Sequence, residues 1–236
     1  MPAMAPQAET LGTLNGNPGL DFKAKLEGFL GNSDDELFSG NPFSNIISNC
    51  NYYDENSFVN SFSNSKYPLV LNLNIQYLNS KIEGLKAFLL SLECKNVIFD
   101  VISLQEISRI ENASFFNISG YHPITYNCRK TLKGGGVGFY IKKELSFNVI
   151  DDLSIFQERI FESKCIEVEY PSGKVLFISI YRPPGNHPYL TNSQLLAAFQ
   201  ENLEFIFNKV GNRNCYILTD SNIGLLEIDR SSDSLL

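Results

Sequence analysis

The sequence predicts an α/β fold in which helices cover mixed β-sheets packed as a sandwich. Apolar strand-like runs alternate with amphipathic helical segments, which favours strands connected by helices. One run is apolar without alternation, as in a strand covered on both faces. The middle of the chain instead contains alternating runs joined by tight turns, which predict antiparallel hairpins. Together these observations favour mixed sheets over a doubly wound parallel sheet.

The first predicted unit is a strand followed by a helix. The run YPLVLNLNI at 67–75 predicts a strand, and the segment 78–95 repeats isoleucine and leucine at helical spacing. Ser80 and Glu83 match a capping box at the start of this helix. The run NVIFDVISLQE at 96–106 is the second predicted strand, and it is the one without alternation.

The second half of the predicted domain begins with hairpin strands. A strand is predicted after the glycine turn at 134–136, and two further strands are predicted to pair across a tight turn at 171–173. A helix with Thr191 and Gln194 as its capping box follows, and CYILTD at 215–220 is the final predicted strand.

The three glycines at 134–136 have two interpretations. They lack the G-K-[ST] ending of a phosphate-binding loop and precede a strand rather than a helix, so we interpret them as a hairpin entry. The basic residues just before them, Arg129, Lys130 and Lys133, are candidates for contact with a nucleic-acid backbone.

Acidic residues are concentrated at the start of the chain. Of the formal net charge of −7, residues 1–65 contribute −6, with two lysines against eight acidic residues. This segment is rich in Asn, Ser and Gly, and its stretch 56–65 is typical of a low-complexity linker. We therefore expect a mostly disordered head at 1–65 and a globular domain over 66–236. The nearly neutral domain neither supports nor excludes a polyanionic partner.

Cysteine usage and hydropathy predict an intracellular protein. The five cysteines are widely spaced, odd in number and without a C-x-x-C pair, so neither a disulfide framework nor a zinc site is indicated. No stretch approaches the roughly 18–20 apolar residues that a membrane span needs, and we expect no membrane partner.

Four predicted strands end in polar residues that can bind a metal ion or a phosphate: Asn74, Glu106, Tyr181, and Asp220 with Asn222. Active sites of layered α/β proteins gather where rigid strands end, so convergence of these ends would form a site. Each residue also has a simpler explanation. Carboxylates and asparagines at strand ends commonly form turns or helix caps, and a half-buried tyrosine can keep its hydroxyl in water.

Five segments, taken in order, resemble the endonuclease domain of LINE-type non-LTR retrotransposons: LNLNIQYLNSKIEGLKAFL, DVISLQEIS, GGGVGFYIKKEL, FISIYRPPGN and YILTDSNIGLL. That domain belongs to the endonuclease/exonuclease/phosphatase superfamily, with DNase I and the apurinic endonucleases. The resemblance runs from about residue 67 to about residue 230. It implies a four-layered, DNase I-like α/β sandwich that nicks DNA so that the 3′ hydroxyl primes reverse transcription, with nuclear action and a reverse transcriptase domain as partner.

The resemblance also implies roles for the five strand-end residues. Glu106 would be the principal ligand of Mg²⁺, with Mn²⁺ as an alternative, and Asn74 would help to hold the metal or the phosphate. Tyr181 would line the scissile phosphate, Asp220 would orient the attacking water, and Asn222 would hold the phosphate side. Oxygen ligands of this kind suit magnesium, which acts on phosphoryl oxygens as a Lewis acid.

Two departures from the family weaken the expected activity. Thr219 and Ser221 stand where the family usually has glycine and phenylalanine. The family also continues to a Ser-Asp-His motif beyond the end of this chain, and neither His122 nor His187 occupies a matching position. Loss of such a histidine typically costs about 10²- to 10⁴-fold in rate. We therefore expect a domain incomplete at its C-terminus that cleaves weakly or not at all.

Two other functions are compatible with the sequence. The first is a phosphatase or lipid phosphodiesterase of the same superfamily. The second is a non-catalytic remnant or binding module in which the sandwich persists without turnover. Metal-dependent nicking of DNA separates both from an endonuclease.

Overall fold

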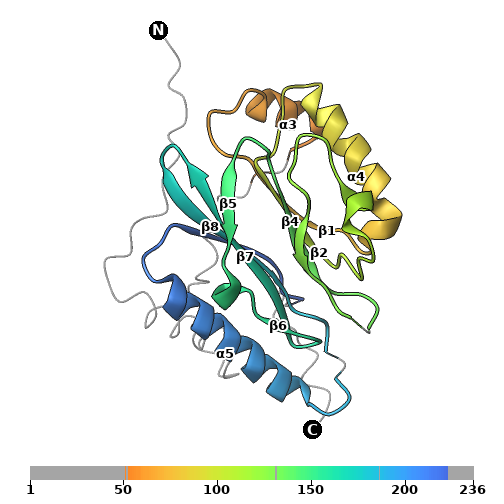
Figure 1. Ribbon diagram of the computed structural model, residues 1–236, viewed down its shortest axis with the longest axis vertical. Coiled ribbons are helices and arrows are strands. Elements are labelled where there is room, and N and C mark those ends of the chain that lie inside the picture. Colours follow the sequence, from red (N-terminus) through yellow and green to blue (C-terminus); the bar gives the residue numbers. More distant parts are fainter. Residues whose placement is uncertain (1–50, 52, 131, 186, 223–236) are drawn as a thin grey trace.

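Two β-sheets pack face to face, and each carries a long helix on its outer face (Figure 1). The helices are α4 (Leu78–Glu93) and α5 (Asn192–Val210). The layers therefore follow the order α4, first sheet, second sheet, α5, which confirms the predicted α/β sandwich of mixed sheets. The computed structural model describes residues 51, 53–130, 132–185 and 187–222.

The first sheet has four strands in the order β1-β2-β4-β3. β1 and β2 are parallel, whereas β4 is antiparallel to both of its neighbours. Helix α4 connects β1 to β2, and a crossover of this kind is what two parallel neighbours require. The bounds are β1 (Val70–Asn74), β2 (Val101–Gln105), β3 (Thr125–Asn127) and β4 (Val137–Ile141), with the short helix η1 (Ala113–Phe116) before β3.

The second sheet has the order β5-β7-β8-β9, and β6 also pairs with β7. The predicted hairpin is β7 with β8, which pair antiparallel from Glu162–Tyr181 to Tyr170–Gly173. Helix α5 connects β8 to β9, and these two strands are parallel. The bounds are β5 (Ser146–Val149), η2 (Asp151–Leu153), β6 (Phe156–Gln157), β7 (Phe161–Tyr170), β8 (Gly173–Tyr181) and β9 (Cys215–Asp220).

Alternation along the strands divides the apolar residues into three clusters. Ile102 belongs to the cluster between the first sheet and α4, and Ile178 belongs to the cluster between the second sheet and α5. Their strand neighbours Val101 and Phe177 point the other way and meet in the layer between the two sheets. Both faces of β2 are covered and all five of its residues are buried, as the sequence indicated for this strand.

The two predicted capping boxes have different outcomes. At the start of α5, Thr191 and Gln194 form the reciprocal capping box, as predicted. At the start of α4 the prediction was wrong, because Tyr77 occupies the capping position with a φ of 72° and no side-chain cap. The Ser80 hydroxyl instead donates to the Tyr77 carbonyl at 2.9 Å.

Part of the expected linker is a helix. Helix α3 (Glu55–Phe62) is capped by Asp54, whose carboxylate accepts from the Ser57 amide at 2.8 Å. Phe58 and Val59 pack against the cluster beneath α4. The linker interpretation of 56–65 was therefore wrong for residues 56–62, because their apolar side chains find a surface to cover. Residues 1–50 and 52 of the predicted disordered head lie outside the described residues.

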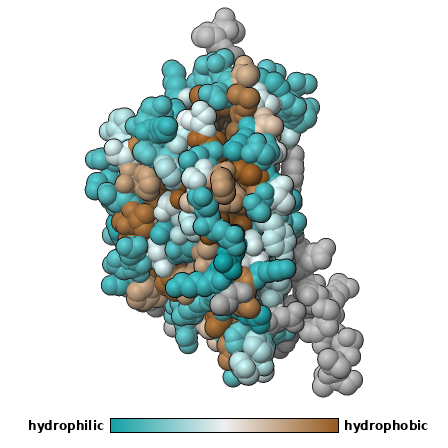
Figure 2. All heavy atoms as spheres, turned by 45° about the vertical axis from the view of Figure 1, so that its right-hand side comes forward, coloured by the Kyte–Doolittle hydropathy of each residue, from teal (hydrophilic) through white to brown (hydrophobic). Residues whose placement is uncertain are grey.

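The surface on the side of α4 is mainly hydrophilic, with hydrophobic residues in small groups (Figure 2). The exposed apolar side chains of α4 are Phe88 and Leu90. Within the described residues, no helix has the length and apolar character that a bilayer crossing requires.

Candidate active site

The layer between the sheets changes from apolar to polar toward one rim. Along β2 the inward residues are Val101, Ser103 and Gln105, and along β8 they include Ser179 and Tyr181. The Ser103 and Ser179 hydroxyls bond across the layer at 2.9 Å. The rim at which these strands end also receives the ends of β1 and β9. The predicted strand-end residues therefore lie on one side of the sandwich.

The amide of Asn74 joins the two carboxylates that the sequence singled out. Its Nδ2 donates to Glu106 Oε1 at 3.0 Å and to Asp220 Oδ2 at 2.6 Å. The Oδ1 of the same amide accepts from the Gln76 backbone N–H at 3.1 Å, which fixes the side chain with its nitrogen toward the carboxylates. Glu106 and Asp220, 32 and 146 positions from Asn74, thus share one amide, although Glu106 follows β2 of the first sheet and Asp220 ends β9 of the second.

Glu106 stands directly after β2 on an unusual backbone. Its φ is 54°, a left-handed conformation that residues with a side chain adopt rarely. The Glu106 carbonyl accepts from the Tyr77 N–H at 2.8 Å, and Tyr77 itself has a φ of 72°. This hydrogen bond between Tyr77 and Glu106, both left-handed, therefore connects the loops that follow β1 and β2.

Tyr181 ends β8 and is paired in register with Asp220 on β9. The residue is only 4% exposed. Burial, and next the negative charge and hydrogen bond of Glu106, raise the pKa of its phenol. A tyrosine of ordinary pKa is already protonated at neutral pH, and this shift extends that state to higher pH. The hydroxyl interacts with the Glu106 carboxylate.

Asn222 lies two residues beyond Asp220, but its carboxamide is directed elsewhere. Its Nδ2 donates to the Arg182 carbonyl at 2.7 Å, and its own carbonyl accepts from Arg182 Nη1 at 3.3 Å. The structure thus brings Asn74, Glu106, Tyr181 and Asp220 together, while Asn222 joins the end of β9 to the segment after β8.

Sequence reasoning missed the polar residues beneath this rim. Gln105 Nε2 donates to Asn72 Oδ1 at 2.7 Å and to the hydroxyls of Ser103 and Ser179, each at 2.9 Å. Gln105 Oε1 is buried without a hydrogen-bond partner. The available signal was the placement of Ser and Gln at alternate positions of an otherwise apolar strand, because such positions share one face.

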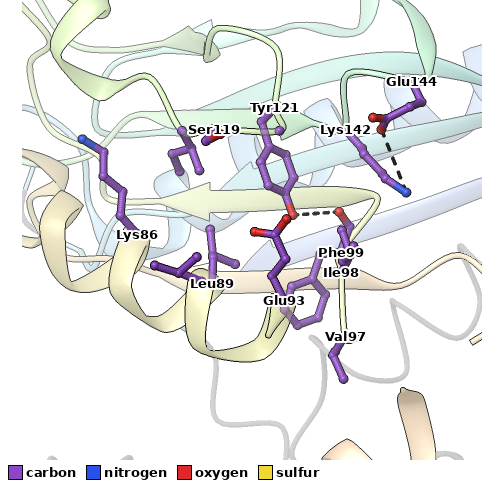
Figure 3. A pocket seen from close by; sticks show the side chains of 13 residues that line it. Lys86, Leu89, Glu93, Val97, Ile98, Phe99, Ser119, Tyr121, Lys142 and Glu144 are labelled. Atoms are coloured by element: carbon purple, nitrogen blue, oxygen red, sulfur yellow. Dashed lines mark hydrogen bonds and ion pairs between the residues drawn. The ribbon is translucent and has the colours of Figure 1, made fainter. Parts of the chain in front are cut away.

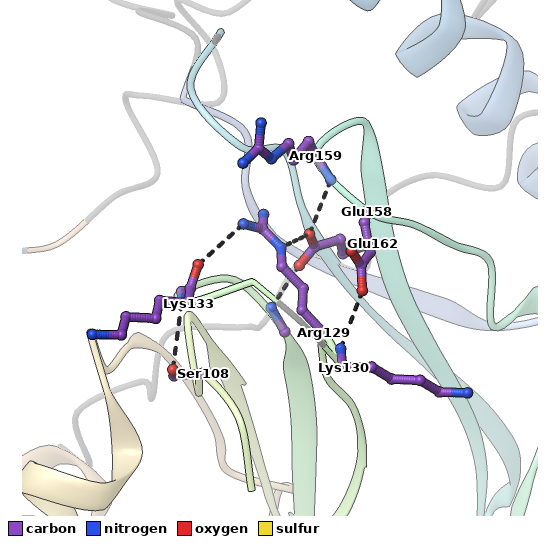
Figure 4. Close-up of polar contacts among 9 residues, drawn as sticks. Ser108, Arg129, Lys130, Lys133, Glu158, Arg159 and Glu162 are labelled. Carbon is purple, nitrogen blue, oxygen red and sulfur yellow. Dashed lines mark hydrogen bonds and ion pairs between the residues drawn. The ribbon is translucent and has the colours of Figure 1, made fainter. Parts of the chain in front are cut away.

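A buried ion pair also lies at this rim (Figure 4). Arg129 Nε donates to Glu162 Oε1 at 2.5 Å, and Glu162 is paired in register with Tyr181. Arg129 was a candidate for contact with nucleic acid, whereas the structure buries it. Lys130 and Lys133, which flank it, are exposed. The glycines after Lys133 lead into β4, as the hairpin-entry interpretation predicted.

The site offers oxygen ligands of the kind that magnesium prefers. Magnesium is commonly held by one or two carboxylates and keeps several waters, so Glu106 and Asp220 fit as its protein ligands. Asn74 presents nitrogen to these carboxylates, and its oxygen would reach a metal only after rotation of the amide. Within the described part of the chain, no three His, Cys, Asp or Glu residues form a metal-binding group.

A cavity of about 250 Å³ lies at the other end of the first sheet (Figure 3). It is bounded by α4, the segment before β2 and the segment after β4. The Tyr121 hydroxyl donates to the Phe99 carbonyl at 2.9 Å, and Lys142 pairs with Glu144 at 4.0 Å. Since these polar groups are engaged with one another, the cavity presents mainly apolar surface.

The chain matches no family model and no curated protein. Among solved structures it is similar to TDP2 of D. rerio complexed with single strand DNA product, at 13% identity and a TM-score of 0.49 over 68% of this chain and 62% of that one. It is also similar to the endonuclease domain of TRAS1, a telomere-specific non-LTR retrotransposon, at 11% identity and a TM-score of 0.48 over 67% and 60%. An AP endonuclease from Archaeoglobus fulgidus gives 17% identity and a TM-score of 0.48 over 66% and 58%. The part of each of these three structures that the chain covers is below two thirds.

Proposed function

We propose that this chain is a metal-dependent phosphodiesterase that nicks DNA, of the kind that non-LTR retrotransposons use with a reverse transcriptase partner. The observation that carries the proposal is the single Asn74 amide shared by Glu106 and Asp220 at 3.0 and 2.6 Å. Two carboxylates repel each other when they are close, so a protein that brings them together commonly does so to hold a cation or to move a proton. The retrotransposon assignment is supported by the order of the sequence motifs.

Each residue of the site has a role that its position allows. A bound magnesium ion would supply Lewis-acid activation of the phosphoryl oxygen, with Glu106 as its main protein ligand. Asp220 accepts a hydrogen bond from the attacking water and orients it toward phosphorus. Asn74 orients both carboxylates through its two hydrogen bonds, so that Glu106 can bind the metal while Asp220 binds the water.

Tyr181 serves as a neutral donor to the phosphate. Its hydroxyl is protonated at neutral pH and lies beside Glu106, so it would donate to a nonbridging oxygen of a bound phosphate without adding negative charge to the site. A donor aimed at charge that develops in the transition state is among the stronger contributions an active site makes. Asn222 supports the end of β9 through Arg182 and thereby supports Asp220.

The test is nicking of a supercoiled plasmid in the presence of Mg²⁺ or Mn²⁺. Glu106→Gln and Asp220→Asn should each lower the rate by about 10²-fold or more. Glu144→Gln, an exposed carboxylate beside the distant cavity, is the matched control and should cleave like the wild-type chain. Because the sequence predicts weak cleavage, the measured quantity is the ratio of rates after long incubation.

Three results would contradict the proposal. If the two site variants nick DNA as fast as the control, the cleavage comes from elsewhere or from a contaminant. If the wild-type chain binds neither Mg²⁺ nor Mn²⁺ and cleaves nothing, the sandwich acts as a binding module. Release of phosphate from a monoester or a lipid headgroup, without nicking, would favour a phosphatase or lipid phosphodiesterase.

A further inference from the structure

Glu162 is a fully buried carboxylate that the proposed reaction does not use. It is 0% exposed, on β7, with its side chain toward the first sheet. Oε1 accepts from Arg129 Nε at 2.5 Å, and Oε2 accepts from the Gly136 N–H at 2.5 Å. A third donor, the Arg159 N–H, lies 3.4 Å from Oε1 (Figure 4). A buried carboxylate is costly unless its oxygens are satisfied, and here both are.

The glycine turn is shaped to lie over this ion pair. Gly134, Gly135 and Gly136 all have positive φ values, from 67° to 83°. A Cβ on Gly135 would stand 2.5 Å from Arg129 Nε and 2.5 Å from Glu162 Oε2. Glycine is therefore required both for the conformation and for the close approach. Because these residues have no side chains, the backbone of the turn lies in direct contact with the Arg129–Glu162 ion pair.

The same turn holds the backbone around Glu106. The Ser108 N–H donates to the Gly135 carbonyl at 2.7 Å, and the Ile107 N–H donates to the Gly136 carbonyl at 3.4 Å. Glu106 and Ser108 both have left-handed φ values, 54° and 65°. Such conformations persist in residues with side chains only where the surrounding structure imposes them. The glycine turn is part of what imposes them here.

We propose that Glu162, together with Arg129, is a positioning residue for Glu106. Its carboxylate fixes the glycine turn, the turn fixes the backbone from Glu106 to Ser108, and that backbone sets the direction of the Glu106 carboxylate. The meaning of this link for metal binding rests on the proposed function, whereas the link itself is a property of the fold. Outer groups that orient a metal ligand typically change metal affinity by about 10- to 100-fold when mutated.

Amide hydrogen exchange of the full chain, followed by NMR, tests the link without any metal. In Glu162→Gln, the new amide must turn its own N–H toward either Arg129 or Gly136, so one of the two hydrogen bonds is lost. The amides of Ser108 and Tyr77 should then exchange at least about tenfold faster. Glu167→Gln, on the same strand but paired with the exposed Lys174, is the matched control and should leave both rates unchanged.

A second variant addresses loss of folding. Removal of one partner leaves the other charge buried alone, and Glu162→Gln could unfold the chain. The double variant Arg129→Met/Glu162→Met keeps side chains of similar length and leaves no buried charge, yet it removes the acceptor of the Gly136 N–H. It should remain folded and show the same faster exchange at Ser108 and Tyr77. Exchange within twofold of wild type in the folded variants would overturn the proposal.

Titration with Mn²⁺, read as paramagnetic broadening of resonances near Glu106 and Asp220, tests the consequence. The apparent Kd for Mn²⁺ should rise by about tenfold or more in the Glu162 variants and stay unchanged in Glu167→Gln. Faster exchange with an unchanged Kd would show that the turn does not position Glu106 for the metal, and would overturn the proposed role. No broadening in the wild-type chain would refute the proposed function. Hydrogen exchange would then still show whether Glu162 holds the backbone from Glu106 to Ser108 through the glycine turn.

Discussion

Replacement of Asn74 by aspartate, Asn74→Asp, tests the site more directly than removal of a carboxylate. The substitution keeps the shape of the side chain but exchanges its amide donor for a third carboxylate. The replaced atom lies 2.6 Å from Asp220 Oδ2 and 3.0 Å from Glu106 Oε1. Three carboxylates, at positions 74, 106 and 220, would then lie together where the Asn74 amide now donates to two.

The expected loss of stability follows from the charges. Two like charges 4 Å apart repel by about 4 kcal/mol at an effective dielectric constant of about 20. Asn74 is only partly buried, so solvent reduces this repulsion, and we expect a loss of about 2 kcal/mol at neutral pH. The neighbouring charges raise the folded-state pKa of the new carboxyl above its unfolded value of about 3.9. The repulsion is therefore absent below that unfolded value, develops as the pH rises, and is complete above the folded-state pKa.

The assay is urea unfolding of the wild-type chain, Asn74→Asp and Asn74→Ala at pH 4 and pH 7, with and without Mg²⁺. Asn74→Ala removes the donor without adding charge and is the control for the lost hydrogen bonds. Mg²⁺ should restore most of the stability of Asn74→Asp at pH 7, because a cation replaces the missing donor. A stability deficit that is the same at both pH values and insensitive to Mg²⁺ would refute this description of the site.

Three further predictions concern single residues. Tyr181→Phe should fold normally and lower the nicking rate by about 10²-fold, measured as plasmid conversion, since it removes one donor to the phosphate. Burial raises the pKa of the Cys165 thiol to about 12, so in the native chain a thiol reagent should modify the exposed Cys94 and leave Cys165 unmodified; rapid labelling of both would contradict this. Gly136→Ala should lower the free energy of unfolding by about 1–3 kcal/mol, because its φ is 83° and its Cβ would lie 2.9 Å from a neighbouring side chain. Gly84→Ala, in a helix with open space around it, should raise that free energy by about 0.5–1 kcal/mol, and equal effects of the two changes would be inconsistent with the structure.

The strand and helix pattern was largely readable from the sequence, because each element carries its own periodicity. The hairpin of β7 with β8 and the helix capped by Thr191 appear where turn and capping residues predicted them. The start of α4 did not follow its local signal. There the left-handed Tyr77 is held by a bond from its N–H to the Glu106 carbonyl, and that contact comes from the next strand. Helix α3 likewise depends on a surface that its own residues do not specify.

The inner polar residues were the least predictable part of the site. Glu162 and Arg129 are separated by 33 positions, with Glu162 on β7 and Arg129 in the segment between β3 and β4, so no local pattern relates them. Gln105 and Ser179 meet across the layer between the sheets, 74 positions apart. Apart from the alternate Ser and Gln positions of β2, the sequence does not distinguish such residues from the polar positions of half-exposed strands. Only the packing of one sheet on the other excludes water from these polar groups, so that they form hydrogen bonds with one another.

The sequence by itself determined the main strands and the two long helices, the mixed character of the sheets and the polar residues at the strand ends, because periodicity, turn chemistry and residue type are local properties. Tertiary structure alone decided that Glu106 and Asp220 share the Asn74 amide, that Asn222 turns to Arg182, and that Glu162 lies beneath the glycine turn. These pairings depend on how two sheets are superposed, and the free energy that selects the superposition comes from apolar residues spread over the whole interior.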